Sequence, residues 1–324
     1  MANIPISITC ADYTRVMPLA AGMIDTPGID LTMILGRAGA WTDRAEMLRR
    51  ATLDATVSGG EGSMAQHLYR IDRGDRSHVG LPVYPLRNLP GRDFYVRKGS
   101  PLKTLADLNG KKVGTYSVSA SGSVWYRHFL RWGGADSSTI EWWVGNIDAP
   151  WGLGANTNPP GTKLAPEGKS LAQMLIAGEI DAITSPPRPK DYHPTNGPIV
   201  RLLPDFVATE QQYWRDTGCF APQHLITIRR EVWEANRWLA KALTDAFIAC
   251  ETMFTACQRS FPYATPWQEA DVENTVGLMG DNYHPYGLPG TAKEVDAFCA
   301  EAFALGLTKK RITVEDYFAD FLAG

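Results

Sequence analysis

Residues 213–228 read YWRDTGCFAPQHLITI, and this stretch decides how the rest of the chain is arranged. The stretch begins with the predicted end of a helix and turns at Gly218. The chain then passes Pro222 and reaches His224. The apolar run that follows, Leu225–Ile228, predicts a buried strand. A histidine at the mouth of a strand can serve a pocket, or it can be a structural residue with satisfied hydrogen bonds. The rest of the sequence is needed to decide between these two roles of His224.

Upstream of this stretch, short apolar segments alternate with helical patterns. Strands are predicted at 4–10, 29–35, 53–57 and 78–84, each followed or preceded by a helix. The third strand is expected to end at the turn 58–62 before the next helix. Such alternation is typical of an α/β sheet with mainly parallel strands and helices on its faces.

A second α/β series follows, with strands predicted at 94–96, 112–115, 140–144, 181–184 and 199–203. Beyond Ile228 the sequence is almost entirely helical in pattern. We therefore predict two lobes with a central cleft and a helical C-terminal region. Lobe 1 is discontinuous, 1–93 plus 225–324, and lobe 2 is 94–224, with an irregular insertion rich in Gly, Pro and Asn at 146–168.

Composition excludes several classes of protein. The chain has 324 residues, 44% of them apolar and 21% charged, which is normal for a globular protein with two domains. A net charge of −3 gives no electrostatic reason to expect nucleic acid or a membrane as partner. Five scattered cysteines without a CxxC pair, and no secretory signal or spanning segment, predict a cytoplasmic protein.

Ligands of open α/β sheets bind beyond the carboxyl ends of the strands, so the residues that follow each strand are the candidates for the site. Arginines, hydroxyls and a helix start together favour a carboxylate ligand. The candidates are Asp12, Tyr13, Arg15, Glu61, Tyr84, Arg87, Thr115, Ser119, Ser121, Arg188, Arg215 and His224.

Several of these residues have a purely structural alternative. Asp12 can cap a helix, and Glu61 can stabilise a helix start through the helix dipole. Arg15 and Arg87 can be surface charges, and the serines at 117–123 can belong to a solvated loop. For Arg188 the rigid turn PPRP at 186–189 favours a role at the crevice. No nucleotide-binding, serine-hydrolase or metal motif is present, and the pair Asp281 and His284 is too little for a metal site.

Segments spread over nearly the full length resemble the 4,5-dihydroxyphthalate decarboxylase family. The segments that carry the resemblance are CADYTR (10–15), PGIDL (27–31), LPVYPLR (81–87), FYVRKGSPLKTLADLNGKKVG (94–114), VWYRHFL (124–130), MLIAGEIDAITSPPRP (174–189), EQQYWRDTGCFAPQHLITIRREVWE (210–234) and MGDNYHPYGL (279–288). The sequence departs from the family pattern at Val57–Glu61, at His284 in place of a tryptophan, and at an extra proline in the 186–189 turn.

The resemblance implies a fold like that of type II periplasmic solute-binding proteins. It also implies a cytoplasmic carboxy-lyase that needs no cofactor and no metal and converts 4,5-dihydroxyphthalate to protocatechuate and CO₂. On that basis we expect His224 to act as acid or base, because imidazole can give or take a proton near neutral pH. We expect Asp12, Tyr13 and Glu61 to face the phenols, and Arg188 with Ser119–Ser121 to hold a carboxylate.

Three alternatives remain open on the sequence. The first is a non-catalytic solute-binding protein for an aromatic carboxylate, because a fold does not fix a function. The second is a decarboxylase of a related phthalate or benzoate, which the departures listed above allow. The third is a metal-assisted decarboxylase. In each case the partner is a small aromatic carboxylate, and a homo-oligomer is possible.

Overall fold

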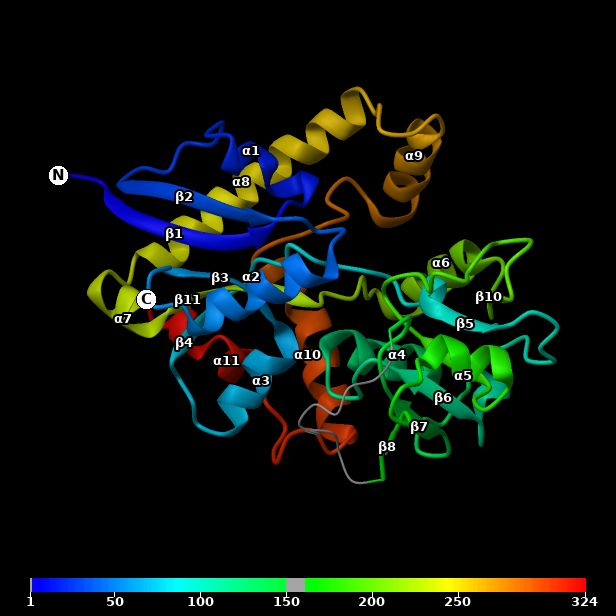
Figure 1. Ribbon diagram of the computed structural model, residues 1–324. Coiled ribbons are helices and arrows are strands. Elements are labelled where there is room, and N and C mark those ends of the chain that lie inside the picture. The colour runs from blue at the N-terminus through cyan, green and yellow to red at the C-terminus, as the bar shows by residue number, and fades with distance from the viewer. Residues whose placement is uncertain (1, 150–160) are drawn as a thin grey trace. The chain divides into compact units, whose positions relative to one another are not determined.

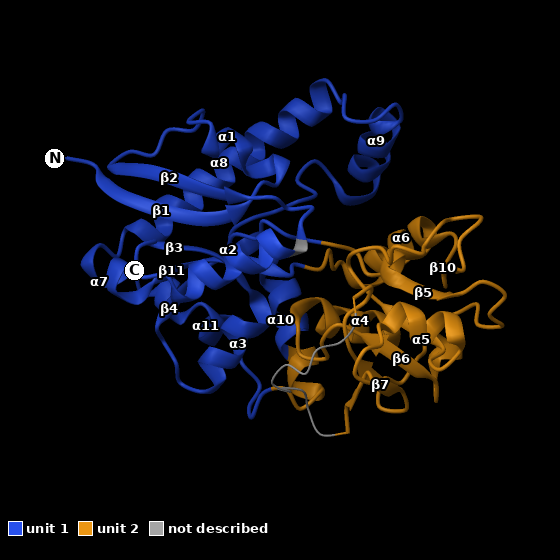
Figure 2. Cartoon of the chain, in the orientation of Figure 1, with its two compact units in different colours: residues 1–87, 222–299, 308–324 blue, residues 88–221, 300–307 orange. Residues whose placement is uncertain are grey.

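The computed structural model describes residues 2–149 and 161–324, without the side chain of Trp41, and shows two compact units (Figures 1 and 2). The first unit contains residues 1–87, 222–299 and 308–324, and the second contains residues 88–221 and 300–307. The chain passes from the first unit to the second after residue 87 and returns after residue 221, whereas the predicted lobes change at 93/94 and 224/225. Residues 300–307, which are the last residues of the helix Leu288–Ala304 and the three residues after it, belong to the second unit, whereas the prediction places them in lobe 1.

The first unit is built on a five-stranded sheet in the order β2-β1-β3-β11-β4. Strands β1 and β2 and strands β1 and β3 are parallel, whereas β11 is antiparallel to both β3 and β4. The sheet is thus mixed, and not mainly parallel as its alternating pattern suggests. The strands are β1 (Ile4–Ala11), β2 (Ile29–Gly36), β3 (Gly59–Ser63), β4 (His78–Leu81) and β11 (His224–Arg229).

The third strand differs from the prediction, and close packing explains why. The predicted strand 53–57 is the end of a helix and a turn, whereas the glycine-rich segment Gly59–Ser63 forms β3. A Cβ on Gly60 would lie 2.0 Å from Thr9 Oγ1, and one on Gly59 would lie 2.1 Å from the carbonyl oxygen of Thr227. Only glycine fits so closely between β1 and β11. Glu61 therefore lies within a strand, not beyond its end.

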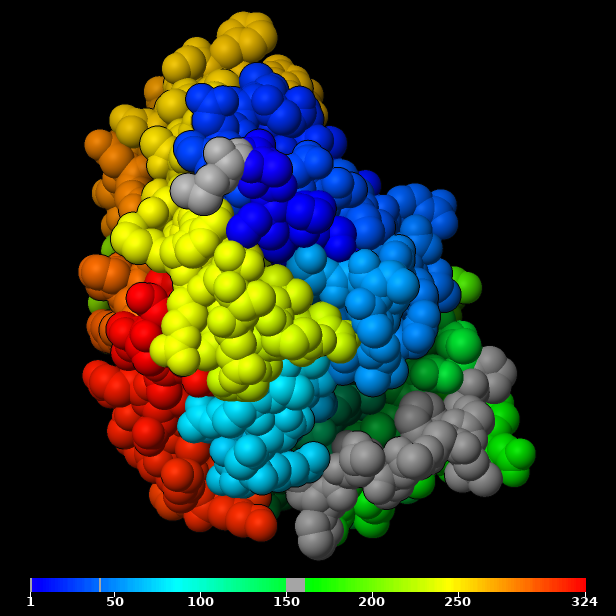
Figure 3. Space-filling view, turned by 90° about the vertical axis from the view of Figure 1, so that its left-hand side faces the viewer, coloured from blue at the N-terminus to red at the C-terminus, as the bar shows by residue number. Residues whose placement is uncertain are grey.

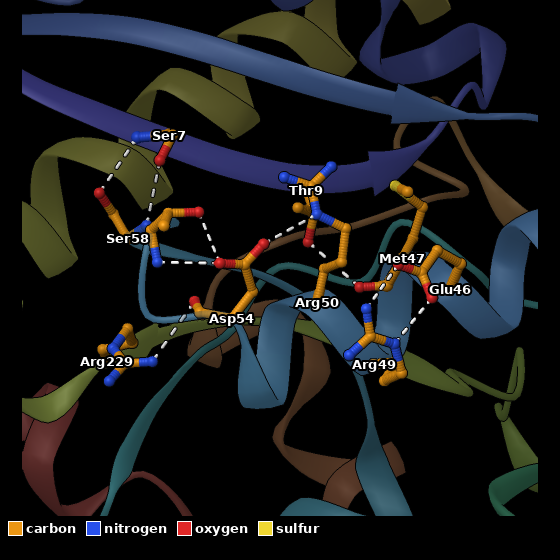
Figure 4. Close-up of polar contacts among 10 residues, drawn as sticks. Ser7, Thr9, Glu46, Met47, Arg49, Arg50, Asp54, Ser58 and Arg229 are labelled. Atoms are coloured by element: carbon orange, nitrogen blue, oxygen red, sulfur yellow. Dashed lines mark hydrogen bonds and ion pairs between the residues drawn. The ribbon is translucent and has the colours of Figure 1, made fainter.

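Hydrogen bonds connect the segment before β3 to the sheet and to helix α2 (Trp41–Leu53) (Figure 4). Ser7 and Ser58 exchange two bonds of 3.1 Å between a backbone N–H and a side-chain oxygen. Asp54 accepts a bond of 3.0 Å from Arg50 on α2. The hydrogen bonds from Thr56 and Arg50 lower the pKa of Asp54 to about 2. These contacts fix where β3 begins, and so they fix the position of Glu61.

Helices cover both faces of the first sheet, with α2 on one side and α8 on the other (Figure 1). Figure 3 shows the surface on which α7 (yellow) lies between the first strand (dark blue) and the segment near residue 75 (cyan). The C-terminal region is mainly helical, as predicted. The helices that lie wholly in this unit are α1 (Met17–Ala20), α2 (Trp41–Leu53), α3 (Met64–Asp72), α7 (Arg230–Ala235), α8 (Leu239–Ser260), α9 (Gln268–Met279), α11 (Val314–Tyr317) and α12 (Ala319–Leu322). Helix α10 (Leu288–Ala304) starts in the first unit and ends in the second.

The second unit is built on a six-stranded sheet in the order β10-β5-β9-β6-β7-β8. Its strands are β5 (Phe94–Arg97), β6 (Lys112–Thr115), β7 (Glu141–Val144), β8 (Lys163–Leu164), β9 (Ala182–Thr184) and β10 (Ile199–Arg201), and its helices are α4 (Ser121–Trp132), α5 (Leu171–Ala177) and α6 (Phe206–Thr217). Ser170 and Gln173 form a capping box at the start of α5. Residues 150–160 of the predicted insertion 146–168 lie outside the described residues, and β8 lies in the described part that follows them.

Candidate functional site

The centre of the candidate site is a buried pair, Glu61 on β3 and His224 on β11. The two strands are antiparallel neighbours, with Ile226 opposite Glu61 and His224 opposite Ser63, so both side chains are held by one stretch of sheet. Glu61 is 2% exposed and His224 is 8% exposed. The imidazole Nδ1 hydrogen-bonds to Glu61 Oε1. Two of the predicted catalytic residues are therefore in direct contact.

Three further donors surround the Glu61 carboxylate. The Tyr13 hydroxyl donates to Oε1 at 2.8 Å, and the Ala11 N–H and the Cys10 thiol donate to Oε2 at 2.9 Å and 3.7 Å. Burial by itself would raise the pKa of Glu61, but the attraction of His224 and the hydrogen bonds outweigh it and lower the pKa. Glu61 is therefore an ionised carboxylate at neutral pH.

The same carboxylate keeps its neighbours protonated. Burial and the negative charge of Glu61 raise the pKa of the Cys10 thiol well above its ordinary value. Burial, followed by the negative charge of Glu61, also raises the pKa of the Tyr13 hydroxyl. Neither group is a nucleophile in this state, and both act as hydrogen-bond donors. The His224 imidazole has a ring nitrogen that can take a proton and give it back.

The hydrogen bond to Glu61 also fixes which nitrogen of His224 is available. An ionised carboxylate accepts from Nδ1–H, so the neutral ring carries its lone pair on Nε2. Within the described part of the chain, Nε2 forms no hydrogen bond. The side chain of His224 is 11% exposed to solvent. His224 can therefore take a proton at Nε2 from a ligand and return it, while Glu61 stabilises the imidazolium.

Asp12 is not part of this pair. Its side chain is exposed and accepts a hydrogen bond of 2.6 Å from the Ala38 N–H, which holds the loop that follows β2. The structural alternative for Asp12, a helix cap, is wrong, since the short 3-10 turn Thr14–Val16 begins after Tyr13 without a side-chain cap. The structure thus gives Asp12 a role in holding a loop.

Tyr84 and Arg87 are buried in the first unit, and their side chains already interact with other residues of the protein. The Tyr84 hydroxyl lies 3.3 Å from Thr291 Oγ1. The Arg87 guanidinium forms an ion pair of 2.7 Å with Glu294 on α10 and donates to the Pro285 carbonyl at 2.9 Å. The surface alternative for Arg87 is wrong, and both residues contribute to the internal packing of α10.

Arg15 differs from Arg87 because no carboxylate neutralises it. Its Nη1 donates to the Pro85 carbonyl at 3.0 Å, and the side chain is half-buried. Burial and the nearby charge of Arg87 lower the pKa of Arg15. Arg15 lies two residues after Tyr13, so the first strand and its turn bring an arginine close to the Glu61 cluster.

The candidates in the second unit form a hydroxyl-rich helix start. Thr115 is buried, and its Oγ1 lies 3.5 Å from Ser123 Oγ. The Ser119 N–H donates to Ser117 Oγ at 3.2 Å, and Ser121 is the first residue of α4. Helix α4 therefore starts among these serines, as expected from the sequence, and its N-cap residue Ala120 provides no side-chain cap.

Arg188 and Arg215 are exposed residues of the second unit. Arg188 follows β9 in the predicted proline turn, and Arg215 lies in the last turn of α6. Neither guanidinium forms a hydrogen bond or ion pair with any residue that the structure describes. Their predicted contact with a ligand carboxylate remains a prediction.

Some buried polar residues of the structure were not singled out from the sequence. In the first unit these are Tyr286 and Glu294. In the second unit Asp93 accepts from Asn88 at 3.0 Å and from Tyr126 at 2.9 Å, and burial raises its pKa to about 8. The one sequence feature that could have marked Asp93 is its position directly before the strand β5.

Two general features of the described residues bear on the class of protein. Among residues 2–149 and 161–324 there is no group of three or more His, Cys, Asp or Glu side chains arranged to hold a metal ion. No helix in the same ranges combines the length and the apolar character needed to cross a bilayer.

Comparison with known proteins confirms the resemblance drawn from the sequence. A 4,5-dihydroxyphthalate decarboxylase of Comamonas testosteroni is 28% identical over 327 residues, which cover 98% of this chain and 97% of the relative. A protein of the same name from Pseudomonas putida is 28% identical over 220 residues, covering 66% of this chain and 83% of the relative. No family model matches the chain. Both relatives are decarboxylases, which confirms the expected enzyme class, a carboxy-lyase.

Solved structures confirm the predicted fold class. The periplasmic aliphatic sulphonate binding protein SsuA of Escherichia coli aligns with a TM-score of 0.53 at 16% identity, over 97% of this chain and 91% of that protein. The alkanesulfonate-binding protein SsuA of Xanthomonas axonopodis pv. citri aligns with a TM-score of 0.52 at 13% identity, over 98% of both chains. The chain therefore has an α/β fold like that of periplasmic binding proteins.

Proposed function

We propose that this protein decarboxylates a hydroxylated aromatic dicarboxylate, with 4,5-dihydroxyphthalate as the substrate and protocatechuate and CO₂ as the products. The observation that carries the proposal is the buried Glu61–His224 pair, which leaves Nε2 of the histidine without a hydrogen-bond partner in the described residues. The full-length similarity to a decarboxylase of that substrate supports the same choice.

The chemistry needs one proton acceptor and one proton donor. In 4,5-dihydroxyphthalate each carboxylate is para to a hydroxyl. Removing the proton from that hydroxyl moves electron density to the ring carbon that carries the carboxylate. A proton then adds to this carbon, the C–C bond to the carboxylate breaks with its electron pair returning to the ring, and CO₂ leaves as the ring becomes aromatic again.

His224 is suited to this proton transfer. The neutral ring takes a proton at Nε2, and the resulting imidazolium is stabilised by the ionised Glu61 at Nδ1. The imidazolium can then deliver a proton to the ring carbon. Tyr13 and the Ala11 N–H hold Glu61 in place through bonds of 2.8 Å and 2.9 Å. No cofactor is required for the electron movement, because the phenol supplies the electrons.

The direct test is product analysis. Purified protein is incubated with 4,5-dihydroxyphthalate, with and without a chelator, and CO₂ and protocatechuate are measured. Formation of both products in equal amounts supports the proposal. Product that disappears with chelator would favour a metal-assisted reaction. A panel of related phthalates and hydroxybenzoates shows whether another substrate is preferred.

A second candidate function is a binding protein for an aromatic carboxylate, which the likeness to sulfonate-binding proteins favours. Tight binding of 4,5-dihydroxyphthalate without release of CO₂ would support it. The buried Glu61–His224 pair argues for catalysis, because a buried ionised carboxylate is costly to maintain and is explained by a role in proton transfer.

A further inference from the structure

We propose that Arg15 and Tyr286 form a carboxylate-binding subsite within the first unit, and that the carboxylate which the substrate retains binds there. The identity of the ligand as an aromatic carboxylate rests on the proposed function. The existence of an anion subsite rests on the two side chains themselves.

The first observation is the missing counter-ion of Arg15. Its Nη1 donates to the Pro85 carbonyl at 3.0 Å, and its guanidinium makes no other hydrogen bond or ion pair with a described residue. The Nε and Nη2 donors are therefore left as a parallel pair, which is the arrangement that binds a carboxylate with two hydrogen bonds. A half-buried guanidinium without a carboxylate is costly unless a ligand supplies one.

The second observation is an independent one, the hydroxyl of Tyr286. Tyr286 is 9% exposed, and its hydroxyl has no hydrogen-bond partner among the described residues. A buried hydroxyl without a partner calls for an explanation, since such groups are nearly always satisfied. Burial raises the pKa of Tyr286, so the hydroxyl stays protonated and can donate to an anion.

Backbone contacts hold the segments that carry these two side chains. The Gly287 N–H donates to the Pro82 carbonyl at 2.7 Å, and Arg87 donates to the Pro285 carbonyl at 2.9 Å. Arg15 itself donates to the Pro85 carbonyl, so the segments 82–87 and 284–287 and the turn after β1 form one framework. Arg15 and Tyr286 also influence each other electrostatically, which places them near one another.

Protein carboxylates near Arg15 do not fill the subsite. Glu294 is paired with Arg87 at 2.7 Å. Glu251 forms no ion pair with Arg15 in the described structure, and its Oε1 instead accepts a hydrogen bond of 2.5 Å from Thr255. Burial also raises the pKa of Glu251, which weakens it as a counter-ion. The positive charge of Arg15 thus remains available to a ligand.

The position of the subsite suits the proposed reaction. Tyr13 precedes Arg15 by two residues and donates to Glu61 at 2.8 Å. A carboxylate held by Arg15 therefore lies in the same part of the first unit as the proton-transfer pair. The subsite predicts that ligands are selected for a carboxylate, so phthalate should bind and catechol, which has the hydroxyls alone, should bind weakly.

The test measures the binding of phthalate and of catechol by isothermal titration calorimetry, which needs no turnover. Arg15→Gln should weaken phthalate binding about tenfold to a hundredfold, and Tyr286→Phe about twofold to tenfold, as expected for a charged and a neutral hydrogen bond. Arg15→Lys should lie between wild type and Arg15→Gln, because it keeps the charge and loses the forked geometry. Catechol binding should stay unchanged in all three variants.

Matched controls remove the same groups elsewhere in the first unit. Arg73→Gln removes a positive charge at the exposed end of α3, and Tyr263→Phe removes an exposed hydroxyl. Both should bind phthalate like wild type. Thermal unfolding checks that each variant is folded, and Tyr286→Phe and Arg15→Lys decide the question if Arg15→Gln does not fold.

Unchanged phthalate binding in folded Arg15→Gln or Arg15→Lys and in Tyr286→Phe would overturn the subsite. An equal loss of phthalate and catechol binding would overturn it as well, because it would indicate general damage. If wild type binds phthalate through Arg15 but releases no CO₂ from 4,5-dihydroxyphthalate, the subsite stands and the proposed catalytic function fails.

Discussion

Replacing Glu61 by glutamine tests the electrostatics of the buried pair. The carboxylate accepts from His224 and Tyr13 at Oε1 and from Ala11 and Cys10 at Oε2. An amide of the same shape has one oxygen and no charge, so its NH₂ group faces either the Ala11 N–H and Cys10 thiol or the His224 ring and Tyr13 hydroxyl, which then lose the carboxylate as their acceptor. We therefore expect Glu61→Gln to lower the free energy of unfolding by about 3 kcal/mol, the usual scale for removing a buried charged acceptor from several hydrogen-bond donors.

The direction of the Glu61 pKa shift predicts how the stability difference between wild type and Glu61→Gln changes with pH. The folded pKa of Glu61 is lowered, so its contribution is fully present above the pKa of an unfolded glutamate, about 4.3. The contribution is lost as the pH falls through the lower folded pKa. The difference in stability between wild type and Glu61→Gln should therefore be constant near neutral pH and shrink below about pH 4.

Urea unfolding followed by tryptophan fluorescence at several pH values measures this difference. Glu46→Gln is the matched control, since Glu46 is 45% exposed in a surface pair with Arg49 and should change stability by less than about 0.5 kcal/mol. A Glu61→Gln protein as stable as wild type at pH 7, or a difference that grows in acid, would refute the reasoning.

Three further predictions concern other parts of the first unit. Gly60→Ala places a methyl group 2.0 Å from an oxygen of β1 and should cost about 3 kcal/mol or more in unfolding experiments. Glu294→Gln leaves the buried Arg87 without its anion and should destabilise by about 3 kcal/mol. Iodoacetamide at pH 8 should modify the exposed Cys257 and leave Cys10 of the folded protein unmodified, because burial and a nearby carboxylate keep the Cys10 thiol protonated. Mass spectrometry of the peptides measures both modifications.

Each of these predictions has a result that contradicts it. Gly39→Ala is the control for the glycine, because nothing lies within 4 Å of its added methyl group, and equal stability of the two variants would remove the packing explanation of β3. A Glu294→Gln protein as stable as wild type would mean that Arg87 has another effective counter-ion. Alkylation of Cys10 at the rate of Cys257 would show that the Glu61 cluster is open to reagents.

The stretch at 213–228 behaves in the structure much as its sequence predicts. Gly218 ends α6 with a φ of 66°, a backbone conformation that favours glycine, and His224 is the first residue of β11. These features are local, because a glycine turn and an apolar run are encoded by neighbouring residues. The same holds for the helices of the C-terminal region.

Features set by long-range contact were not predictable from one sequence. Glycine is a poor strand former, so the strand Gly59–Ser63 is revealed only by the close approach of Thr9 and Thr227. The antiparallel placement of β11 between β3 and β4 depends on pairing across more than 140 residues. The ion pair of Arg87 with Glu294 joins residues 207 apart in sequence, so no local pattern marks it.

The candidate site was predictable in part for the same reason. Glu61 and His224 were both candidates because of their places beside strands, but their contact comes from the register of β3 and β11. Arg15 was a candidate as well, whereas the lack of a partner for Tyr286 emerges only from its burial. Side-chain type and position along a strand can nominate a residue, and only tertiary packing shows whether it is already paired.

The measurement that bears most directly on the proposed function is the turnover of 4,5-dihydroxyphthalate by wild type and His224→Gln, followed as CO₂ release. General acid–base catalysis by His224 predicts CO₂ from wild type and a turnover lower by about a hundredfold or more in the variant, with substrate still bound. Equal turnover by both proteins would remove His224 from the reaction, and no CO₂ from wild type would contradict the decarboxylase itself.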